Sequence, residues 1–142
     1  MSANILIVDD SRIMRQMIKR TIQVAGLDVG ACYEAGNGIE GFAQLAEHDI
    51  DVVILDINMP VMNGVQFLKR VHDDARLCKV PVVIASTEGS ETRINELMSY
   101  GAAGYVRKPF QPEQLRDVLT PLMGLNAESA ATGDAGDDEG AF

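Results

Sequence analysis

The sequence predicts an α/β domain with a doubly wound sheet of five parallel strands. Short apolar runs without polar alternation recur along the chain, as in Val52 to Leu55, and such runs are typical of parallel strands that are covered on both faces. Longer segments between these runs carry apolar residues at helical spacing. Strands separated by helices of this size form right-handed βαβ units, which build a doubly wound sheet.

The first half of the chain contains three of the expected strands. Ile5 to Asp9, Val29 to Glu34 and Val52 to Asp56 are the apolar runs, of which the second is the weakest. Between them we expect a helix from Arg12 to Val24, ended by Gly26, and a helix from Ile39 to Ala46. Their predicted core faces are Met14, Met17, Ile18 and Ile22 in the first helix, and Ile39, Phe42, Ala43 and Ala46 in the second.

The second half continues the alternation. Its strands are predicted at Pro81 to Ser86 and Gly104 to Arg107. Gly101 closes one of its helices, and Pro112 suits the first turn of another because the missing amide hydrogen is not needed there. The predicted helices run from Val65 to Val71, Thr92 to Tyr100 and Pro112 to Met123.

Polar residues within the strands predict their order. The first, third and fourth strands are uniformly apolar, whereas the second and fifth contain Gly30, Glu34, Tyr105 and Arg107. The two more polar strands suit the edges of the sheet, which fits the order 2-1-3-4-5.

Length and composition indicate one domain, residues 1–124, followed by a tail. The chain has 142 residues, of which 46% are hydrophobic, enough for a core without disulfides. After Gly124 the helical periodicity stops and small and acidic residues dominate, so we expect residues 125–142 to be a flexible acidic tail.

Charge and cysteine usage exclude several functions. The net charge is -9, and no stripe of Lys and Arg is present to bind nucleic acid. Cys32 and Cys78 match no metal spacing and are expected to be buried free thiols, as in a reducing compartment. The N-terminal apolar run, Ile5 to Val8, is too short for a signal peptide or a membrane span. We therefore expect a cytoplasmic protein without membrane insertion.

Four strands end in residues with charged or nucleophilic side chains. The residues at these strand ends are Asp9-Asp10, Asp56, Ser86-Thr87 and Lys108-Pro109. Ligands of open α/β sheets bind at the carboxyl ends of the strands, so the four ends predict one site.

The aspartates of this site require a cation. Three ionised carboxylates repel one another unless they are protonated or bound to a positive ion. Mg²⁺ is the expected cofactor because it prefers oxygen ligands and typically uses one or two carboxylates, waters and phosphate oxygens. Lys108 and Ser86 add a positive charge and a hydroxyl donor, which together suit phosphoryl transfer, with Asp56 as nucleophile.

These residues resemble the CheY-type receiver domains of two-component response regulators, which have a flavodoxin-like fold. The resemblance covers about residues 3 to 124. It depends on several motifs in order: Asp9-Asp10-Ser11-Arg12, Asp56-Ile57-Asn58-Met59-Pro60, Asn63-Gly64, Ser86, Tyr105 and Lys108-Pro109-Phe110.

The resemblance implies a role for each site residue. Asp56 would be the phosphoacceptor, and Asp10, Asp56 and the backbone carbonyl of Asn58 would bind Mg²⁺, with Asp9 helping through water. Lys108 and Ser86 would bind the phosphoryl group, and Ser86 and Tyr105 would move on activation. Lys108-Pro109 would be a cis peptide bond. Thr87 departs from the small residue common at its position and would restrict access to the acyl phosphate.

The function implied is a single-domain response regulator that is a switch and not a turnover enzyme. Its expected partners are a sensor histidine kinase and a downstream protein that binds the face made by strands 4 and 5 with their helices. A phosphatase is a further candidate partner. We expect a role in chemotaxis or motility, and an intermediate in a phosphorelay is the alternative.

Two other classes share parts of this pattern. A phosphatase of the haloacid dehalogenase type also uses an aspartate nucleophile, but it places a second aspartate where this chain has Asn58, which cannot transfer a proton. A flavodoxin-like FMN carrier needs a phosphate-binding loop after the first strand, where Asp9 and Asp10 would repel the phosphate.

Overall fold

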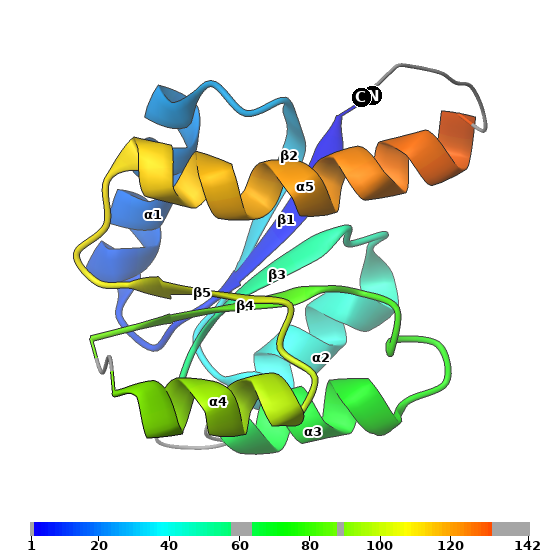
Figure 1. The fold of residues 1–142 in the computed structure, drawn as a ribbon. Coiled ribbons are helices and arrows are strands. Elements are labelled where there is room, and N and C mark those ends of the chain that lie inside the picture. The colour runs from blue at the N-terminus through cyan, green and yellow to red at the C-terminus, as the bar shows by residue number, and fades with distance from the viewer. Residues whose placement is uncertain (1, 58–63, 88–89, 132–142) are drawn as a thin grey trace.

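The described residues form five strands and five helices in strict alternation (Figure 1). A computed structural model of the chain describes residues 2–57, 64–87 and 90–131. The strands are β1 (Ala3–Val8), β2 (Val29–Ala35), β3 (Val52–Asp56), β4 (Val82–Ser86) and β5 (Gly104–Arg107). The helices are α1 (Arg12–Ala25), α2 (Gly38–Glu47), α3 (Gly64–Asp73), α4 (Glu91–Ser99) and α5 (Pro112–Ala131).

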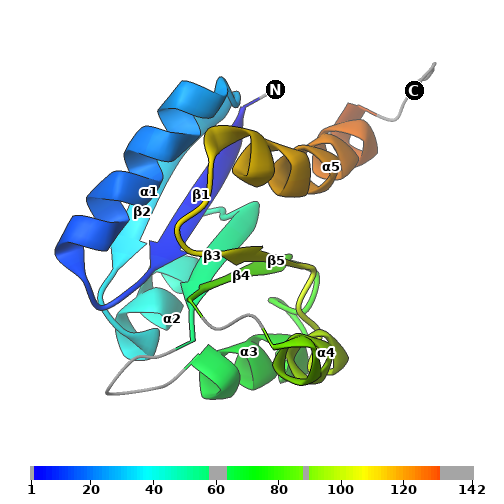
Figure 2. The same cartoon turned by 60° about the vertical axis from the view of Figure 1, so that its left-hand side comes forward.

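All the strands are parallel and follow the order β2-β1-β3-β4-β5, which confirms the predicted fold class. The helices cover both faces of the sheet. Figure 2 shows α1 and α5 on one face and α2, α3 and α4 on the other. The central strands are therefore shielded from water on both sides, as their uniform apolar composition requires.

Each central strand supplies both halves of the core. Successive side chains of a strand point to opposite faces of the sheet. In β1, Leu6 and Val8 join the core cluster beneath α2, α3 and α4, whereas Ile5 and Ile7 join the cluster beneath α1 and α5. The strands are thus held by two hydrophobic layers, and their carboxyl ends are left as the place where polar side chains can gather.

Capping residues set the ends of several helices. Ser11 begins α1, where its side-chain oxygen accepts a hydrogen bond from the amide of Met14. Gly26 ends the same helix in the left-handed conformation with φ 74°, which confirms the expected stop. Asn37 and Ser90 cap α2 and α4 in the same way as Ser11 caps α1. These caps satisfy backbone donors that have no partner within the helix.

The buried face of α2 differs from the predicted one. Gly38, Gly41 and Leu45 are buried, while Ile39 is 60% exposed. A Cβ atom at Gly41 would lie 2.8 Å from the ring of Phe67. The glycines let the helix approach its neighbours closely. Of the predicted face, Phe42 does pack against the core, whereas the prediction was wrong for Ile39, Ala43 and Ala46, which are exposed.

The last helix continues beyond its predicted end. α5 reaches Ala131, not Met123. The additional segment contains Leu125, Glu128 and three alanines, residue types with high intrinsic helix propensity. The predicted helix end at Met123 was therefore wrong. The rest of the expected tail, 132–142, lies outside the described residues, and the domain boundary stays a prediction.

Both cysteines are free, as expected, but only one is sheltered. Cys32 is partly buried in β2, whereas Cys78 is exposed after α3, so the prediction of a buried Cys78 was wrong. Among the helices of the described ranges, none combines the length and the hydropathy needed to cross a membrane.

Candidate functional site

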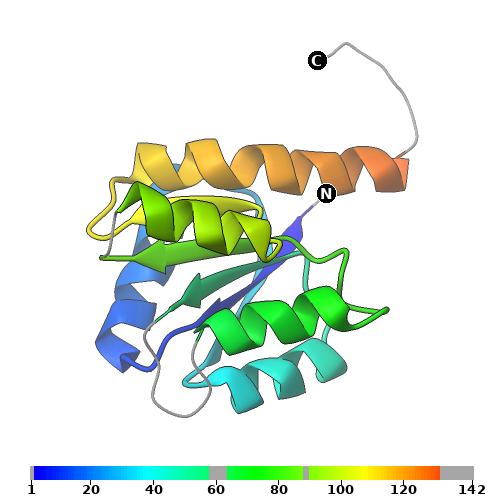
Figure 3. The same cartoon turned by 60° about the horizontal axis from the view of Figure 1, so that its bottom comes forward.

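Strand register brings the predicted site residues to one edge of the sheet. Val8 pairs with Leu55, so Asp9 and Asp56 follow aligned positions on neighbouring strands. Asp56 in turn pairs with Ala85, the residue before Ser86. Figure 3 shows the strand arrows pointing toward the same edge, close to the start of α1. The carboxyl ends of β1, β3, β4 and β5 therefore surround one site.

Three carboxylates meet at this edge. Asp9, Asp10 and Asp56 each offer an oxygen within 4.8 Å of the oxygens of the other two. Asp9 and Asp56 are 2% and 8% exposed, while Asp10 is open to solvent. Carboxylates this close repel one another, and a divalent cation between them would relieve the repulsion. The donor set fits Mg²⁺, since it consists of oxygens only and its exposed side leaves room for the waters that Mg²⁺ keeps.

Lys108 supplies a positive charge inside the same cluster. Its Nζ lies 2.9 Å from Asp9 Oδ2 and 3.5 Å from Asp56 Oδ1, and its side chain is only 9% exposed. The amide of Lys108 donates to the carbonyl of Ser86 at 2.8 Å, and the peptide bond to Pro109 is cis. Lys108 thus contacts both buried carboxylates, and its shorter contact is with Asp9. The ammonium therefore sits between the two buried carboxylates.

The expected switch residues lie on β4 and β5 or directly after β4. Ser86 is 2% exposed at the end of β4, and Thr87 beside it is exposed. The hydroxyl of Tyr105 on β5 is buried and has no hydrogen-bond partner among the described residues. Asn58, the expected carbonyl ligand, lies outside the described residues. Ser86 is thus adjacent to Asp56 through the sheet register. Tyr105 pairs with Ile84 of the neighbouring strand β4 and carries the unsatisfied hydroxyl.

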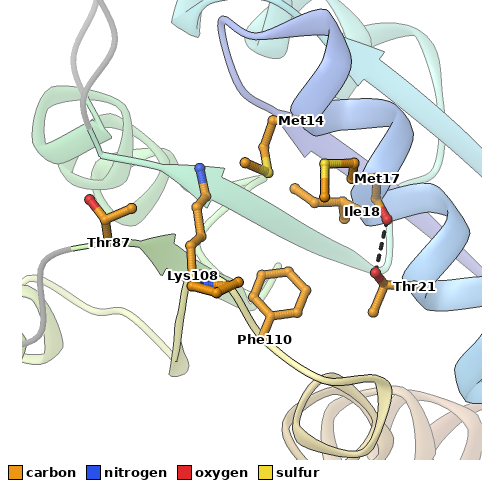
Figure 4. A pocket seen from close by; sticks show the side chains of 8 residues that line it. Met14, Met17, Ile18, Thr21, Thr87, Lys108 and Phe110 are labelled. Carbon is orange, nitrogen blue, oxygen red and sulfur yellow. Dashed lines mark hydrogen bonds between the residues drawn. The ribbon is translucent and has the colours of Figure 1, made fainter.

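A mainly apolar cavity of about 190 Å³ borders Lys108. Figure 4 shows Met14, Met17 and Ile18 of α1 on one side of it and Phe110, after β5, on the other. Thr87 also lines it, next to Lys108. Met17 is 56% exposed, so its predicted place in the core was wrong. The two methionines therefore lie on a face of α1 that lines this open cavity, and Met14 also packs against the core.

The profile of the response regulator receiver domain family matches residues 5–120. The chain belongs to this family. Its receiver fold is also that of solved relatives. It is similar to the chemotaxis response regulator CheY4 of Vibrio cholerae, with a TM-score of 0.74 and 38% identity over 86% of this chain and 99% of that one.

The chain is also similar to chemotaxis proteins of other bacteria. The receiver is 37% identical to CheY1 of Helicobacter pylori over 123 residues, which are 86% of this chain and 98% of that protein. It is 35% identical to CheY of Thermotoga maritima over 122 residues, again 86% and 98% of the two chains. The chain is thus a receiver domain of the CheY type, and neither rival class from the sequence is supported by these matches.

The sequence analysis missed a cluster of three charged residues, Arg15, Lys19 and Glu34, which contacts the backbone of Asp9. Arg15 of α1 donates from Nη1 to the main-chain carbonyl of Asp9 at 2.6 Å and from Nε to Glu34 of β2 at 2.9 Å. Lys19 binds the other carboxylate oxygen of Glu34 at 3.1 Å. The only signals in the sequence were a carboxylate near the end of an edge strand and two basic residues one helical turn apart.

The electrostatics of Glu34 follow from these contacts. Its burial by itself would raise the pKa of the carboxyl group. The hydrogen bonds and charges of Arg15 and Lys19 outweigh that effect and hold the pKa of Glu34 below its usual value. Glu34 is therefore a carboxylate at neutral pH.

Proposed function

We propose that this receiver is a phosphorylation switch in which Asp56 accepts a phosphoryl group from the phosphohistidine of a sensor kinase. The observation that carries the proposal is the placement of Lys108 between Asp9 and Asp56 at the open edge where three carboxylates meet. A lysine and an acidic metal site around a carboxylate nucleophile are the parts that phosphoryl transfer needs.

The chemistry is a displacement at phosphorus. A carboxylate oxygen of Asp56 forms a bond to phosphorus while the bond to the histidine nitrogen breaks, and the electron pair of that bond returns to the imidazole. The product is an acyl phosphate on Asp56. Lys108 would neutralise charge on the transferred oxygens without having to be brought in, because its ammonium already lies 3.5 Å from Asp56.

The metal site supports the same step. Asp9, Asp10 and Asp56 would hold Mg²⁺, together with the carbonyl of Asn58 that the family resemblance implies. When bound, Mg²⁺ would supply positive charge to the transferred phosphoryl oxygens. The residues of the chain position that charge: Asp9 is held by Lys108, and its Oδ1 accepts a hydrogen bond from the amide of Ser11 at 2.9 Å.

The phosphoryl group would be read out through Ser86 and Tyr105. A buried hydroxyl without a partner costs free energy, so any conformer that satisfies the Tyr105 hydroxyl is favoured on that account. Contact between Ser86 and the phosphoryl group would shift the population toward such a conformer. The surface affected would be the face made by β4, α4, β5 and α5, where the downstream protein would bind.

The pathway proposed is chemotaxis or a related motility response, because the similar proteins carry that function in their names. An intermediate in a phosphorelay remains the second candidate. In either case the chain would act as a switch that passes its state to protein partners, including a phosphatase, and would not be a turnover enzyme.

Substitution D56N tests the acceptor. Incubation with acetyl phosphate and Mg²⁺ should add an acid-labile phosphoryl group to the wild type and none to the variant, measured by intact-protein mass. D49N is the matched control, because Asp49 is an exposed aspartate and its substitution should leave labelling unchanged. Undiminished labelling of D56N would assign the acceptor to another residue.

Beryllofluoride with Mg²⁺ should also shift the amide resonances of Ser86 and Tyr105 in the wild type but not in D56N.

A further inference from the structure

The amide, the carbonyl and the carboxylate of Asp9 all have partners, whereas its neighbour Asp10 is exposed to solvent. The amide of Asp9 donates to the carbonyl of Ala35 at 3.0 Å. Its carboxylate binds Lys108 and the amide of Ser11. Its carbonyl accepts the hydrogen bond from Arg15. Asp10 extends from this fixed residue into solvent.

The orientation of the Asp9 carbonyl fixes the position of the Asp10 backbone. The carbonyl of one residue and the amide of the next lie in one rigid peptide plane. A rotation about the Cα–C bond of Asp9 would therefore break the contact with Arg15 and at the same time swing the Cα atom of Asp10 away from the cluster. The guanidinium opposes that rotation, and the bond from Nε to Glu34 keeps the guanidinium in place.

We propose that Arg15 is a positioning residue, which fixes the peptide between Asp9 and Asp10 so that the exposed carboxylate is presented to a divalent cation. The inference depends on the proposed metal site and goes beyond it by naming a residue that touches neither metal nor phosphoryl group. Outer groups that orient metal ligands typically change metal affinity by about 10- to 100-fold when they are removed.

If the charge of Arg15 were its only influence on the metal site, removing it should strengthen Mg²⁺ binding. A cation near a metal site lowers the affinity of that site for Mg²⁺, so loss of a positive charge should raise it. Arg15 and Lys19 both bind Glu34 and carry the same charge. Of these two residues, only Arg15 contacts the carbonyl of Asp9. R15M and K19M therefore remove the same charge and an ion pair to the same carboxylate, but only R15M removes the positioning bond.

Calorimetric titration of the full chain with MgCl₂ at constant ionic strength separates these effects. R15M should bind Mg²⁺ about tenfold or more weakly than the wild type, and K19M should bind equally well or slightly better. R15K keeps the charge, but a lysine lacks the fork that reaches two acceptors, so it should also bind more weakly than the wild type. Wild-type affinity in R15M would overturn the inference while leaving the proposed function intact. Absence of Mg²⁺ binding by the wild type would instead overturn the metal site itself.

A second measurement needs no metal. In metal-free protein, the amide resonance of Asp10 should shift or broaden in R15M and stay in place in K19M, while circular dichroism checks that both variants are folded. If Arg15 only ties α1 to β2, both variants should lower the melting temperature alike and neither should move the Asp10 resonance. That result would also overturn the positioning role.

Discussion

The two cysteines differ in chemistry because their surroundings differ. Burial of Cys32, in β2, raises the pKa of its thiol to about 11; the charge of Lys19 lowers it somewhat, and that of Glu34 raises it. Cys78 is exposed. A thiol reacts as the thiolate, and a pKa near 11 leaves only about one thiolate in a thousand at pH 8. Cys32 is therefore poorly suited to redox chemistry at physiological pH.

Alkylation with iodoacetamide at pH 8 should modify one thiol rapidly and the other slowly. Cys78 should react first, because reagent and solvent reach it. Peptide mass mapping over time would identify the labelled residue, and C78S should leave only the slow reaction. The rate at Cys32 should rise roughly tenfold per pH unit from pH 8 to 10 as its thiolate fraction grows. Equal rates at the two sites, or a pH-independent rate at Cys32, would contradict this assignment.

At the scale of the elements, the start of α3 lies directly on the end of β3. The amide of Gly64 donates to the carbonyl of Ile57 at 2.8 Å. A Cβ atom at Gly64 would come 2.5 Å from the Cα of Ile57 and 2.7 Å from the carbonyl oxygen of Asp56. These are backbone atoms, which cannot step aside as a flexible side chain can. The helix and the proposed phosphoacceptor strand therefore share one tightly packed junction.

G64A should both destabilise the domain and disturb the site. Overpacking of this kind costs about 1–3 kcal/mol, and the displaced atoms belong to Asp56 and its neighbour. Urea unfolding would measure the loss, and titration with Mg²⁺ would measure weaker binding. G30A is the matched control, since the nearest atom to its added Cβ is the end of the Asn4 side chain, which can move. If G64A unfolds at the same urea concentration as G30A, the junction is looser than the structure indicates.

The strand ends were predictable from sequence because two general rules act together. Uniform apolar runs indicated parallel strands, and parallel strands in the order β2-β1-β3-β4-β5 place Asp9, Asp56 and Ser86 on one edge whatever the details of packing. The supporting contacts were not predictable in this way. The bond from Arg15 to the carbonyl of Asp9 depends on the distance between α1 and the strand ends, which no local pattern encodes.

Packing also determines which residues of a helix are buried and which of two partners a side chain contacts more closely. In α2, Gly41 is buried because close approach to Phe67 needs a missing Cβ, while Ile39 is exposed. Lys108 lies closer to Asp9 than to Asp56, a difference of 0.6 Å between two contacts that side-chain reach alone does not determine. Apolar periodicity therefore located the elements well, and it was least informative where backbone atoms come into close contact.

At the scale of the whole molecule, the carboxylate cluster adds repulsion to a chain whose net charge is already -9. Among the residues that the structure describes, Lys108 is the buried cation that contacts the three acidic groups of the cluster. Any cation that accumulates near the protein should reduce this repulsion, but only a bound divalent ion should do so at the strand ends. General screening and specific binding therefore both raise stability and can be separated by salt type.

Mg²⁺ should raise the melting temperature more than NaCl of the same ionic strength. At ten times its dissociation constant, a ligand that binds only the folded state adds about 1.4 kcal/mol, which corresponds to a rise of about 3–6 °C for a chain of this size. Differential scanning calorimetry with matched salts would measure the difference. D10N should lose the increment specific to Mg²⁺ yet melt slightly higher than the wild type without metal, because one of the repelling charges is gone. If NaCl and MgCl₂ raise the wild-type melting temperature equally, the cluster is only screened, and the strand ends do not form a metal site.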